Sequence, residues 1–354
     1  MRIELRRPDD FHVHFRRGHV LRTVVPFTAE QFGRAMVMPN TSPRPILTAA
    51  DADSYRHEIL AALRDTDHAG SFEPLMTIQI TQATTPATVR DAAGSAGIIA
   101  GKLYPKGVTT GSGNGVTNIR ALYPVFEEME RAGLVLSLHG QLGEAFILDR
   151  EREFLGALRD IAERFPGLRI VLEHISTAEA VETVRDLPAN VAGTITAHHL
   201  MLTLHDVLSW VGDDGSEGLC PHHYCQPIPQ RPEDRQALLD AARSGNPKFF
   251  FGSDTAPHLR ERKESACGCA GVFSAPVLLP VLLDIFGAGE QSGEQVVGAM
   301  QSFVSEFGAR FYGLPLNAGT VALTREEWTV PQSCGGIVPF LAGRKLAWKV
   351  ASVR

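Results

Sequence analysis

The chain has 354 residues, of which 44% are hydrophobic and 21% are charged, and its formal net charge is −6. These values suit a globular protein with a large core, and the acidic balance argues against a nucleic-acid-binding protein. No run of about 18 apolar residues is present, and MRIELRRPDD lacks a signal peptide's apolar segment, so we expect no membrane partner. Five cysteines, an odd number, suit a reducing cytosol better than a disulfide framework, which predicts a cytoplasmic protein.

Apolar, β-rich runs alternate with helical patterns from residue 10 onward. The predicted strands span 10–16, 34–40, 74–81, 97–105, 134–140, 168–176, 191–199 and 248–254. The predicted helices span 48–65, 116–133, 149–167, 177–188 and 232–245, and another begins near Pro86. This alternation over about 250 residues predicts an α/β fold, a closed (β/α)8 TIM barrel. A doubly wound open sheet is the alternative, but no GxGxxG turn follows the first strand.

The remaining segments complete the expected domain organisation. Residues 106–116, KGVTTGSGNGV, predict a long flexible loop because they are rich in Gly, Ser and Thr. From residue 274 onward there are further helical patterns and one strand-like run, TVALTREEWTV. We expect a single domain over residues 1–354, with the barrel at about 8–260 and a C-terminal extension of helices and strands at about 274–354.

The stretch FHVHFR, residues 11–16, carries two histidines separated by one residue. In a strand, alternate side chains point to the same face, so His12 and His14 project together. Two neutral imidazoles on a rigid strand make half of a metal site. Arg16 continues that face and would bring a fixed cation to an anionic ligand.

Other polar residues recur at or near the ends of later predicted strands. They are Asn40, Lys102, His139, His174 and Asp254. In a TIM barrel the C-terminal ends of the strands converge on one mouth, where active sites are built. Each residue has a structural alternative, such as a hydrogen-bonded core histidine in VLEHIS, but together they predict a metal centre.

Lys102 needs a separate argument because a protonated lysine donates three hydrogen bonds and cannot ligate a metal. In an apolar strand beside cations its pKa falls, and the neutral amine appears. A neutral amine can add carbon dioxide to form a carbamate, which is a carboxylate able to bridge two metals. The alternative is a lysine that pairs with Asp254 or extends its charged end toward solvent.

The motifs FHVHFR, MPN, GKLYP, LSLHG, LEHIS and GSDTAPHLRERKESACGCAG together resemble the class II, bacterial-type dihydroorotases of the amidohydrolase superfamily, from residue 10 to about residue 330. The resemblance implies a barrel with two Zn²⁺ per chain and a carboxylated lysine (N6-carboxylysine) at Lys102 bridging them. One zinc would be held by His12, His14 and Asp254, and the other by His139 and His174.

The same resemblance implies a substrate site and a reaction. The implied substrate-binding residues are Arg16, Asn40, His139, Gln226, His258 and Ala270, and the implied lid residues are Thr109 and Thr110. The implied reaction is the reversible cyclisation of N-carbamoyl-L-aspartate to L-5,6-dihydroorotate in pyrimidine biosynthesis. In the hydrolytic direction a metal-bound hydroxide would attack the ring carbonyl, with Asp254 as the catalytic proton shuttle. The resemblance also implies a homodimer.

Three positions depart from the family pattern. Arg17 stands where Asp is usual, Gln141 replaces Glu in the HGE motif, and Gln226 replaces an aliphatic residue. Two alternative functions remain. A hydantoinase- or allantoinase-like enzyme would need no carboxylate-binding group such as Arg16 with His258, and an inactive barrel serving a carbamoyltransferase would have lost metal ligands.

Some residues are left without an assigned role. His198 and His199 fall near the predicted barrel mouth. The CxC at Cys267 and Cys269 fits either buried thiols or a structural zinc. The run RERKE, residues 260–264, predicts a solvated loop with charge pairs.

Overall fold

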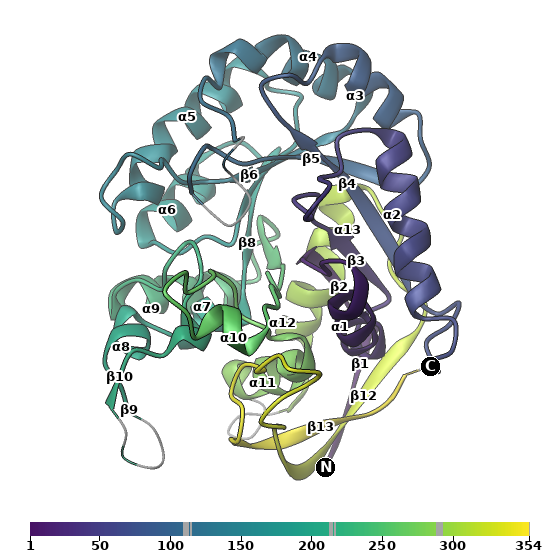
Figure 1. Cartoon of the computed structure of the whole chain (residues 1–354), viewed down its shortest axis with the longest axis vertical. Coiled ribbons are helices and arrows are strands. Elements are labelled where there is room, and N and C mark those ends of the chain that lie inside the picture. Colours follow the sequence, from purple (N-terminus) through teal and green to yellow (C-terminus); the bar gives the residue numbers. More distant parts are fainter. Residues whose placement is uncertain (109–112, 114, 212–214, 216, 288–292, 354) are drawn as a thin grey trace.

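The computed structural model of the chain describes residues 1–108, 113, 115–211, 215, 217–287 and 293–353 (Figure 1). At its centre is a parallel sheet of eight strands in the order β11-β8-β7-β6-β5-β4-β3-β2. The strands are β2 (Asp9–Val13), β3 (Arg34–Val37), β4 (Glu73–Ile80), β5 (Ile98–Leu103), β6 (Val135–His139), β7 (Ile170–Glu173), β8 (Val191–Ile195) and β11 (Phe249–Phe251). The predicted (β/α)8 barrel is confirmed.

The barrel closes where β11 meets β2. The backbone N–H of Asp254 donates to the carbonyl of His12 at 2.9 Å, and that of His14 donates to Thr255 at 2.9 Å. A parallel bridge between Val13 and Thr255 completes the contact. The first and last barrel strands therefore meet beside three of the predicted metal ligands.

Helices surround the strands, and Figure 1 shows α2 to α6 as an outer arc. The helices up to residue 263 are α1 (Gly18–Gln31), α2 (Ala49–Ala62), α3 (Pro86–Ala93), α4 (Tyr123–Ala132), α5 (Arg150–Arg164), α6 (Ala178–Asp186), α7 (Ala197–Met201), α8 (Leu204–Leu208), α9 (Pro232–Arg243) and α10 (Arg260–Lys263). Thr48 caps α2 through the N–H of Asp51, and Gly133 ends α4 with a φ of 73°.

The structure corrects two expectations in this region. Helix α1 has no counterpart among the predicted helices, and its apolar face packs Leu21, Val24 and Val25 into the core. The strand predicted at 191–199 ends at Ile195, and His198 and His199 belong to α7. Thr196 explains the change, because its hydroxyl accepts from the N–H of His199 as a helix N-cap.

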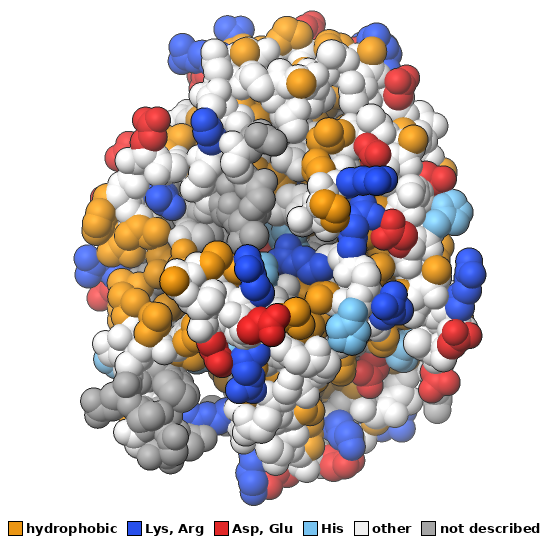
Figure 2. All heavy atoms as spheres, in the orientation of Figure 1, with side chains coloured by type: hydrophobic (Ala, Val, Ile, Leu, Met, Phe, Trp, Pro, Cys, Tyr) orange, Lys and Arg blue, Asp and Glu red, His pale blue; other side chains and the backbone are white. Residues whose placement is uncertain are grey.

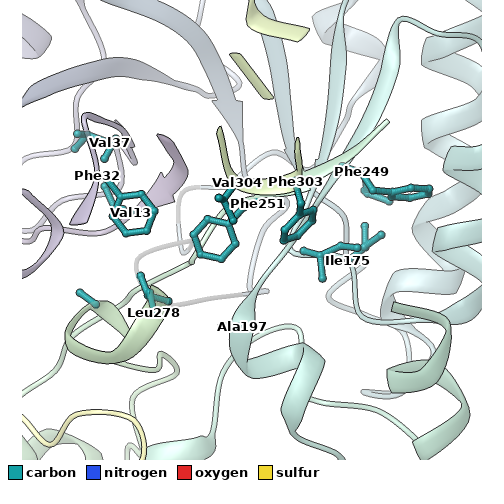
Figure 3. Packing of buried hydrophobic residues seen from close by; sticks show 14 of the residues in the cluster. Val13, Phe32, Val37, Ile175, Ala197, Phe249, Phe251, Leu278, Phe303 and Val304 are labelled. Carbon is teal, nitrogen blue, oxygen red and sulfur yellow. The ribbon is translucent and has the colours of Figure 1, made fainter. Parts of the chain in front are cut away.

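The C-terminal segment closes one end of the barrel. It contains α11 (Leu278–Phe286), α12 (Gly293–Gln301), a π-helical turn (Ser302–Glu306) and α13 (Phe307–Tyr312). Figure 1 shows α13 among the strands, where the Tyr312 ring stacks on Phe11 at 4.8 Å between centroids. On the outer side, Figure 3 shows Phe303 beside Phe251, with ring centroids 6.0 Å apart.

Two small sheets lie outside the barrel. The strands β1 (Arg2–Arg6), β12 (Thr320–Thr329) and β13 (Lys345–Val353) form an antiparallel sheet in the order β1-β12-β13. Residues before the barrel thus join the predicted extension, and Figure 1 shows the N-terminus beside that sheet. Strands β9 (Trp210–Val211) and β10 (Glu217–Gly218) form a two-stranded antiparallel sheet. Of the helices that the structure describes, none is long and apolar enough to cross a membrane.

Candidate metal centre and substrate pocket

The closing contact of the barrel gathers His12, His14 and Asp254. The Oδ1 atom of Asp254 lies 3.3 Å from Nε2 of His12 and 3.2 Å from Nε2 of His14. The two imidazole Nε2 atoms are 3.2 Å apart, and all three side chains are buried. Two imidazoles and a carboxylate converging in this way are a donor set suited to a divalent metal ion.

Several predicted site residues have a left-handed backbone, which is uncommon outside glycine. The φ angles are 60° at Arg16, 43° at His174 and 45° at Asp254. Such residues cost about 1–3 kcal/mol each and persist where the surroundings hold them. The structure also corrects one expectation, because β2 ends at Val13 and Arg16 does not continue the strand face. The turn at Arg16 places its side chain in the pocket instead.

His139 and His174 form a second group on the other side of the pocket. Their ring centroids are 4.6 Å apart, and the His174 ring centroid lies 5.1 Å from that of His12. Nε2–H of His139 donates to the amide oxygen of Gln141 at 2.9 Å, which leaves Nδ1 with its lone pair. Burial lowers the pKa of His139 to about 3, and both histidines are therefore neutral, as metal ligands must be.

An orphaned nitrogen supports the same conclusion for His174. Its Nδ1 atom is buried and has no hydrogen-bond partner among the residues that the structure describes. A buried polar atom left in this way usually marks a missing ligand, water or ion. The donor set and the orphaned nitrogen together fit a metal centre.

Lys102 lies on β5, fully buried beside these histidines. Its Nζ atom is 3.6 Å from Oε2 of Glu173, beyond hydrogen-bond distance, and 5.2 Å from the centroid of the Tyr104 ring. Burial lowers the pKa of Lys102, although the carboxylates of Glu173 and Asp254 act in the opposite direction. Burial therefore favours the neutral amine of Lys102 over its ammonium form.

Glu173 is the functional candidate that sequence reasoning missed. Its carboxylate contacts Nδ1 of His12 and so directs Nε2 of that ring toward the pocket. The motif LEHIS places it directly before His174, and strand alternation would point the two side chains to opposite faces. The left-handed backbone of His174 removes this conflict, because β7 ends at Glu173 and the chain turns immediately afterwards.

The predicted substrate residues Arg16, Asn40, Gln226 and Ala270 line the same pocket as His12, His14, His139, His174 and Asp254. Nη2 of Arg16 lies 3.0 Å from Nε2 of His258, and that nitrogen lies 3.1 Å from the carbonyl oxygen of Ala270. Burial, and next the charge of Arg16, lower the pKa of His258 to about 2, so this imidazole is neutral. Figure 2 shows basic and histidine side chains gathered in a central hollow of this face.

Two other sequence predictions have different outcomes. Thr109 and Thr110, the expected lid residues, lie outside the residues that the structure describes. Arg17, which departs from the family pattern, points away from the pocket. Its Nη1 atom donates to Glu58 at 2.5 Å, and its guanidinium carbon lies 4.6 Å from the centroid of the Tyr55 ring.

Lys263 shows that the run RERKE is not simply a solvated loop. The side chain is buried, and its ammonium donates to the carbonyls of Tyr224, Cys269 and Gly271 at 2.9, 2.8 and 2.8 Å. These carbonyls belong to the two segments that carry Gln226 and Ala270 into the pocket. Lys263 therefore ties together the two loops on one side of the substrate site.

Glu151, at the start of α5, has a similar role behind His174. Its carboxylate accepts from the backbone N–H of Ser176 at 3.0 Å and from the hydroxyl of Thr177 at 2.5 Å. Burial raises the pKa of Glu151 to about 7, although these hydrogen bonds oppose the rise. The contact fixes the loop that follows β7, which carries His174.

A barrel with polar residues at its strand ends and a buried imidazole–carboxylate centre defines a metal-dependent hydrolase of the amidohydrolase type. The amidohydrolase family matches residues 10–193. A dihydroorotase of Marinobacter nauticus is 46% identical over 357 residues, which is 99% of each chain. The chain therefore belongs to the amidohydrolase family and, within it, to the dihydroorotases.

Two solved structures agree with this assignment. The dihydroorotase of Campylobacter jejuni has 35% identity and a TM-score of 0.86, covering 99% of this chain and 98% of that one. The dihydroorotase of Saccharomyces cerevisiae, in complex with 5-fluoroorotic acid, has 34% identity and the same TM-score of 0.86 and coverage.

Proposed function

We propose that this chain interconverts N-carbamoyl-L-aspartate and L-5,6-dihydroorotate, opening and closing a cyclic amide as a step of pyrimidine biosynthesis. The observation that carries the proposal is the convergence of a buried metal-ligand set and the half-buried guanidinium of Arg16 on one pocket. The first suits amide hydrolysis, and the second suits a substrate that carries a carboxylate.

The proposed cofactor is a pair of Zn²⁺ ions. His12, His14 and Asp254 would hold one ion, and His139 and His174 would hold the other. Metal ions bound there would activate a water molecule and polarise the substrate carbonyl. The chain's own contribution is to hold four buried imidazoles and one carboxylate in place at the ends of the barrel strands and in the turns that follow them.

Asp254 is the proposed proton shuttle. Although burial raises the pKa of this carboxyl, the neighbouring His12 and His14 hold it well below its usual range. An ionised carboxylate at the floor of the pocket can accept a proton from the attacking water. It can then deliver that proton to the ring nitrogen that leaves, and the reverse sequence closes the ring.

Arg16 is the proposed anchor for the substrate carboxylate. Its guanidinium is half-buried, and its Nε donates to the carbonyl of Pro257 at 3.1 Å. Within the part of the chain that the structure describes, no carboxylate lies within ion-pair distance of Arg16. A dihydroorotate carboxylate would therefore compensate the charge of this guanidinium, with the amide of Asn40 and the neutral His258 beside it.

The direct test measures hydrolysis of dihydroorotate and of hydantoin by the protein before and after complete metal removal. We expect turnover of dihydroorotate alone, its loss on chelation, and its return when Zn²⁺ is added, with close to two ions per chain bound at the catalytic pocket. Faster turnover of hydantoin would favour a hydantoinase-like enzyme. Undiminished activity of the metal-free protein would refute the metal mechanism.

The proposed bridge between the ions is a carbamate on Lys102. A lysine amine cannot bridge two cations, and a carbamate supplies an anion with two oxygens. Burial of the amine beside His139 and His174 favours its neutral form, which is the form that adds carbon dioxide.

The substitution Lys102→Ala should remove metal and activity together, and a short-chain carboxylate added with zinc should restore part of both. Lys106→Ala is the matched control, because Lys106 is an exposed lysine four residues further on. A crystal structure near neutral pH that shows an unmodified amine in active, metal-loaded enzyme would disprove the bridge.

Three further assignments belong to the same proposal. Thr109 and Thr110 would donate hydrogen bonds to the bound carboxylate as parts of a closing lid, and replacing both by Ala should lower turnover without loss of metal. The protein would work as a homodimer. It would reside in the cytosol, whose reducing conditions suit its five free cysteines.

A further inference from the structure

A second group of metal-competent side chains lies next to the pocket and has no role in the proposed reaction. His198 and His199 sit on α7, directly after β8, and Cys225 lies in the segment that leads to Gln226. One ligand atom from each of the three residues lies within 4.8 Å of the others, and all three side chains are buried.

The distances between these atoms suit a single ion. Sγ of Cys225 lies 3.9 Å from Nε2 of His199 and 3.2 Å from the carbonyl oxygen of Pro227. The same carbonyl is 3.0 Å from Nε2 of His199. A thiolate and an imidazole on one tetrahedral zinc ion are about 3.5 Å apart, given bond lengths near 2.3 and 2.0 Å.

The hydrogen bonds of His199 allow it to ligate without moving its ring. Its Nδ1 atom lies 2.9 Å from the hydroxyl of Thr196, and its Nε2–H now donates to the carbonyl of Pro227. If the proton resides on Nδ1 instead, it donates to the Thr196 hydroxyl and Nε2 becomes free to bind a cation. Ligating histidines are commonly fixed in this way by a hydrogen bond on the other nitrogen.

His198 supplies an independent indication. The side chain is fully buried, and neither of its ring nitrogens has a hydrogen-bond partner in the described part of the chain. The His198 and His199 ring centroids are 4.7 Å apart. Two unpartnered nitrogens on one buried imidazole are costly unless a ligand satisfies them.

We propose that His198, His199 and Cys225 form a third metal site, separate from the catalytic pair, which binds a thiophilic divalent cation such as Zn²⁺. When the cation binds, the thiol of Cys225 releases its proton to solvent, and the resulting thiolate offsets one of the two positive charges of the ion. The carbonyl of Pro227 is placed to complete the coordination. Because Cys225 and Pro227 flank Gln226, the ion would fix the segment that forms one wall of the substrate pocket.

The test uses the full-length protein, depleted of metal and reloaded with Co²⁺. The proposed catalytic centre contains no sulfur ligand, so a thiolate-to-cobalt charge-transfer band in the near ultraviolet cannot come from the catalytic pair. We expect close to three cobalt ions per chain and one thiolate band. Cys225→Ser should abolish the band and remove one ion while two remain.

Two other variants make the result decisive. His198→Gln keeps the thiol and removes one imidazole, and it should weaken cobalt binding at this site at least tenfold. The double substitution Cys267→Ser with Cys269→Ser removes the CxC, whose sulfurs are 3.4 Å apart, and should leave the band unchanged. Two ions with no thiolate band, or a band that follows the CxC, would overturn the proposal.

A kinetic readout separates this site from the proposed function itself. Loss of the third ion should raise KM for dihydroorotate several-fold and leave kcat unchanged, because only the pocket wall loosens. The cobalt band is measured without substrate, so it tests the third site even if dihydroorotate is not the substrate.

Discussion

Replacing Lys263 by Met tests whether its hydrogen bonds hold the two segments that form one wall of the substrate pocket. The Met side chain has nearly the length of the lysine stem and keeps its apolar packing. It removes the donor to the carbonyls of Tyr224, Cys269 and Gly271, which lie 2.8–2.9 Å from the ammonium. The substitution thus removes the ammonium charge and its three hydrogen bonds and keeps the apolar stem.

The size of the effect follows from the acceptors that lose their donor. The carbonyl of Tyr224 keeps the N–H of Gly271 as a donor at 2.9 Å, so the carbonyls of Cys269 and Gly271 are the two that lose theirs. A buried acceptor left without a donor costs about 1–3 kcal/mol, so two cost at least about 2 kcal/mol unless the loops move to reach water. Such movement would shift the backbones of Gln226 and Ala270 in the pocket. If about 1.4 kcal/mol of substrate binding is lost, KM rises about tenfold.

The pH dependence sharpens this prediction. Burial lowers the pKa of Lys263 to about 8. Above that pH the neutral amine has two protons for three carbonyls, so KM of the wild type should rise toward the value of the variant. Lys263→Met should show the raised KM below pH 8 as well, with a smaller change across it.

The assay is steady-state hydrolysis of dihydroorotate from pH 6.5 to 9.5, with metal content measured in each preparation. Arg262→Met is the matched control, because Arg262 is exposed on the same short helix. A Lys263→Met enzyme whose KM equals that of the control at pH 7 would refute this account of the pocket wall.

Three further substitutions test other parts of the site. Arg16→Met should raise KM for dihydroorotate about 10- to 100-fold, the equivalent of a lost charged hydrogen bond, with the metal content unchanged by elemental analysis. Glu173→Gln should weaken metal binding about 10- to 100-fold in a chelator competition, because it loosens the ring of His12. Glu151→Gln should make the free energy of unfolding less dependent on pH between pH 4.5 and 7. In this pH range the unfolded wild type releases a proton that the folded form retains. The free energy of unfolding of the wild type therefore falls as pH rises, by up to about 3 kcal/mol.

Much of the fold could be predicted because apolar periodicity reflects burial. The barrel strands from β4 to β7 and the helices α2, α3, α5 and α6 lie within a few residues of their predicted ranges. Helix α4 begins at Tyr123 rather than near residue 116. Helix α1 was missed because it has no side-chain N-cap and contains Pro26, so its sequence lacks the usual signals. Strand β13 was missed because its partner β12 is a neighbour only in the folded chain.

Residues of the candidate site at strand ends could be predicted, whereas those that support them could not. His139 and Lys102 were found because strand ends converge in a barrel, whatever the contacts of each side chain. Glu173 and Lys263 could not be found in that way. Strand alternation predicts that the side chain of Glu173 points away from the pocket. The charged run RERKE, which contains Lys263, is typical of an exposed surface loop. The position of Glu173 depends on the left-handed backbone of His174, and the role of Lys263 depends on three backbone carbonyls. Neither feature can be read from residue type or spacing.

The junction of β2 and β11 brings together three of the proposed metal ligands, His12, His14 and Asp254, where the regular ladder ends. Strand β11 has only three residues, and side chains replace part of the ladder beyond it. The carboxylate of Asp10 accepts from the N–H of Ser253 at 2.8 Å and from that of His12 at 3.1 Å, and the Ser253 hydroxyl donates to the His12 carbonyl at 3.1 Å. These contacts release the backbone of Asp254 from strand geometry, which allows its left-handed turn. The side chain can then face His12 across the junction, so the irregular closure of the barrel assembles the His12, His14 and Asp254 half of the proposed ligand set.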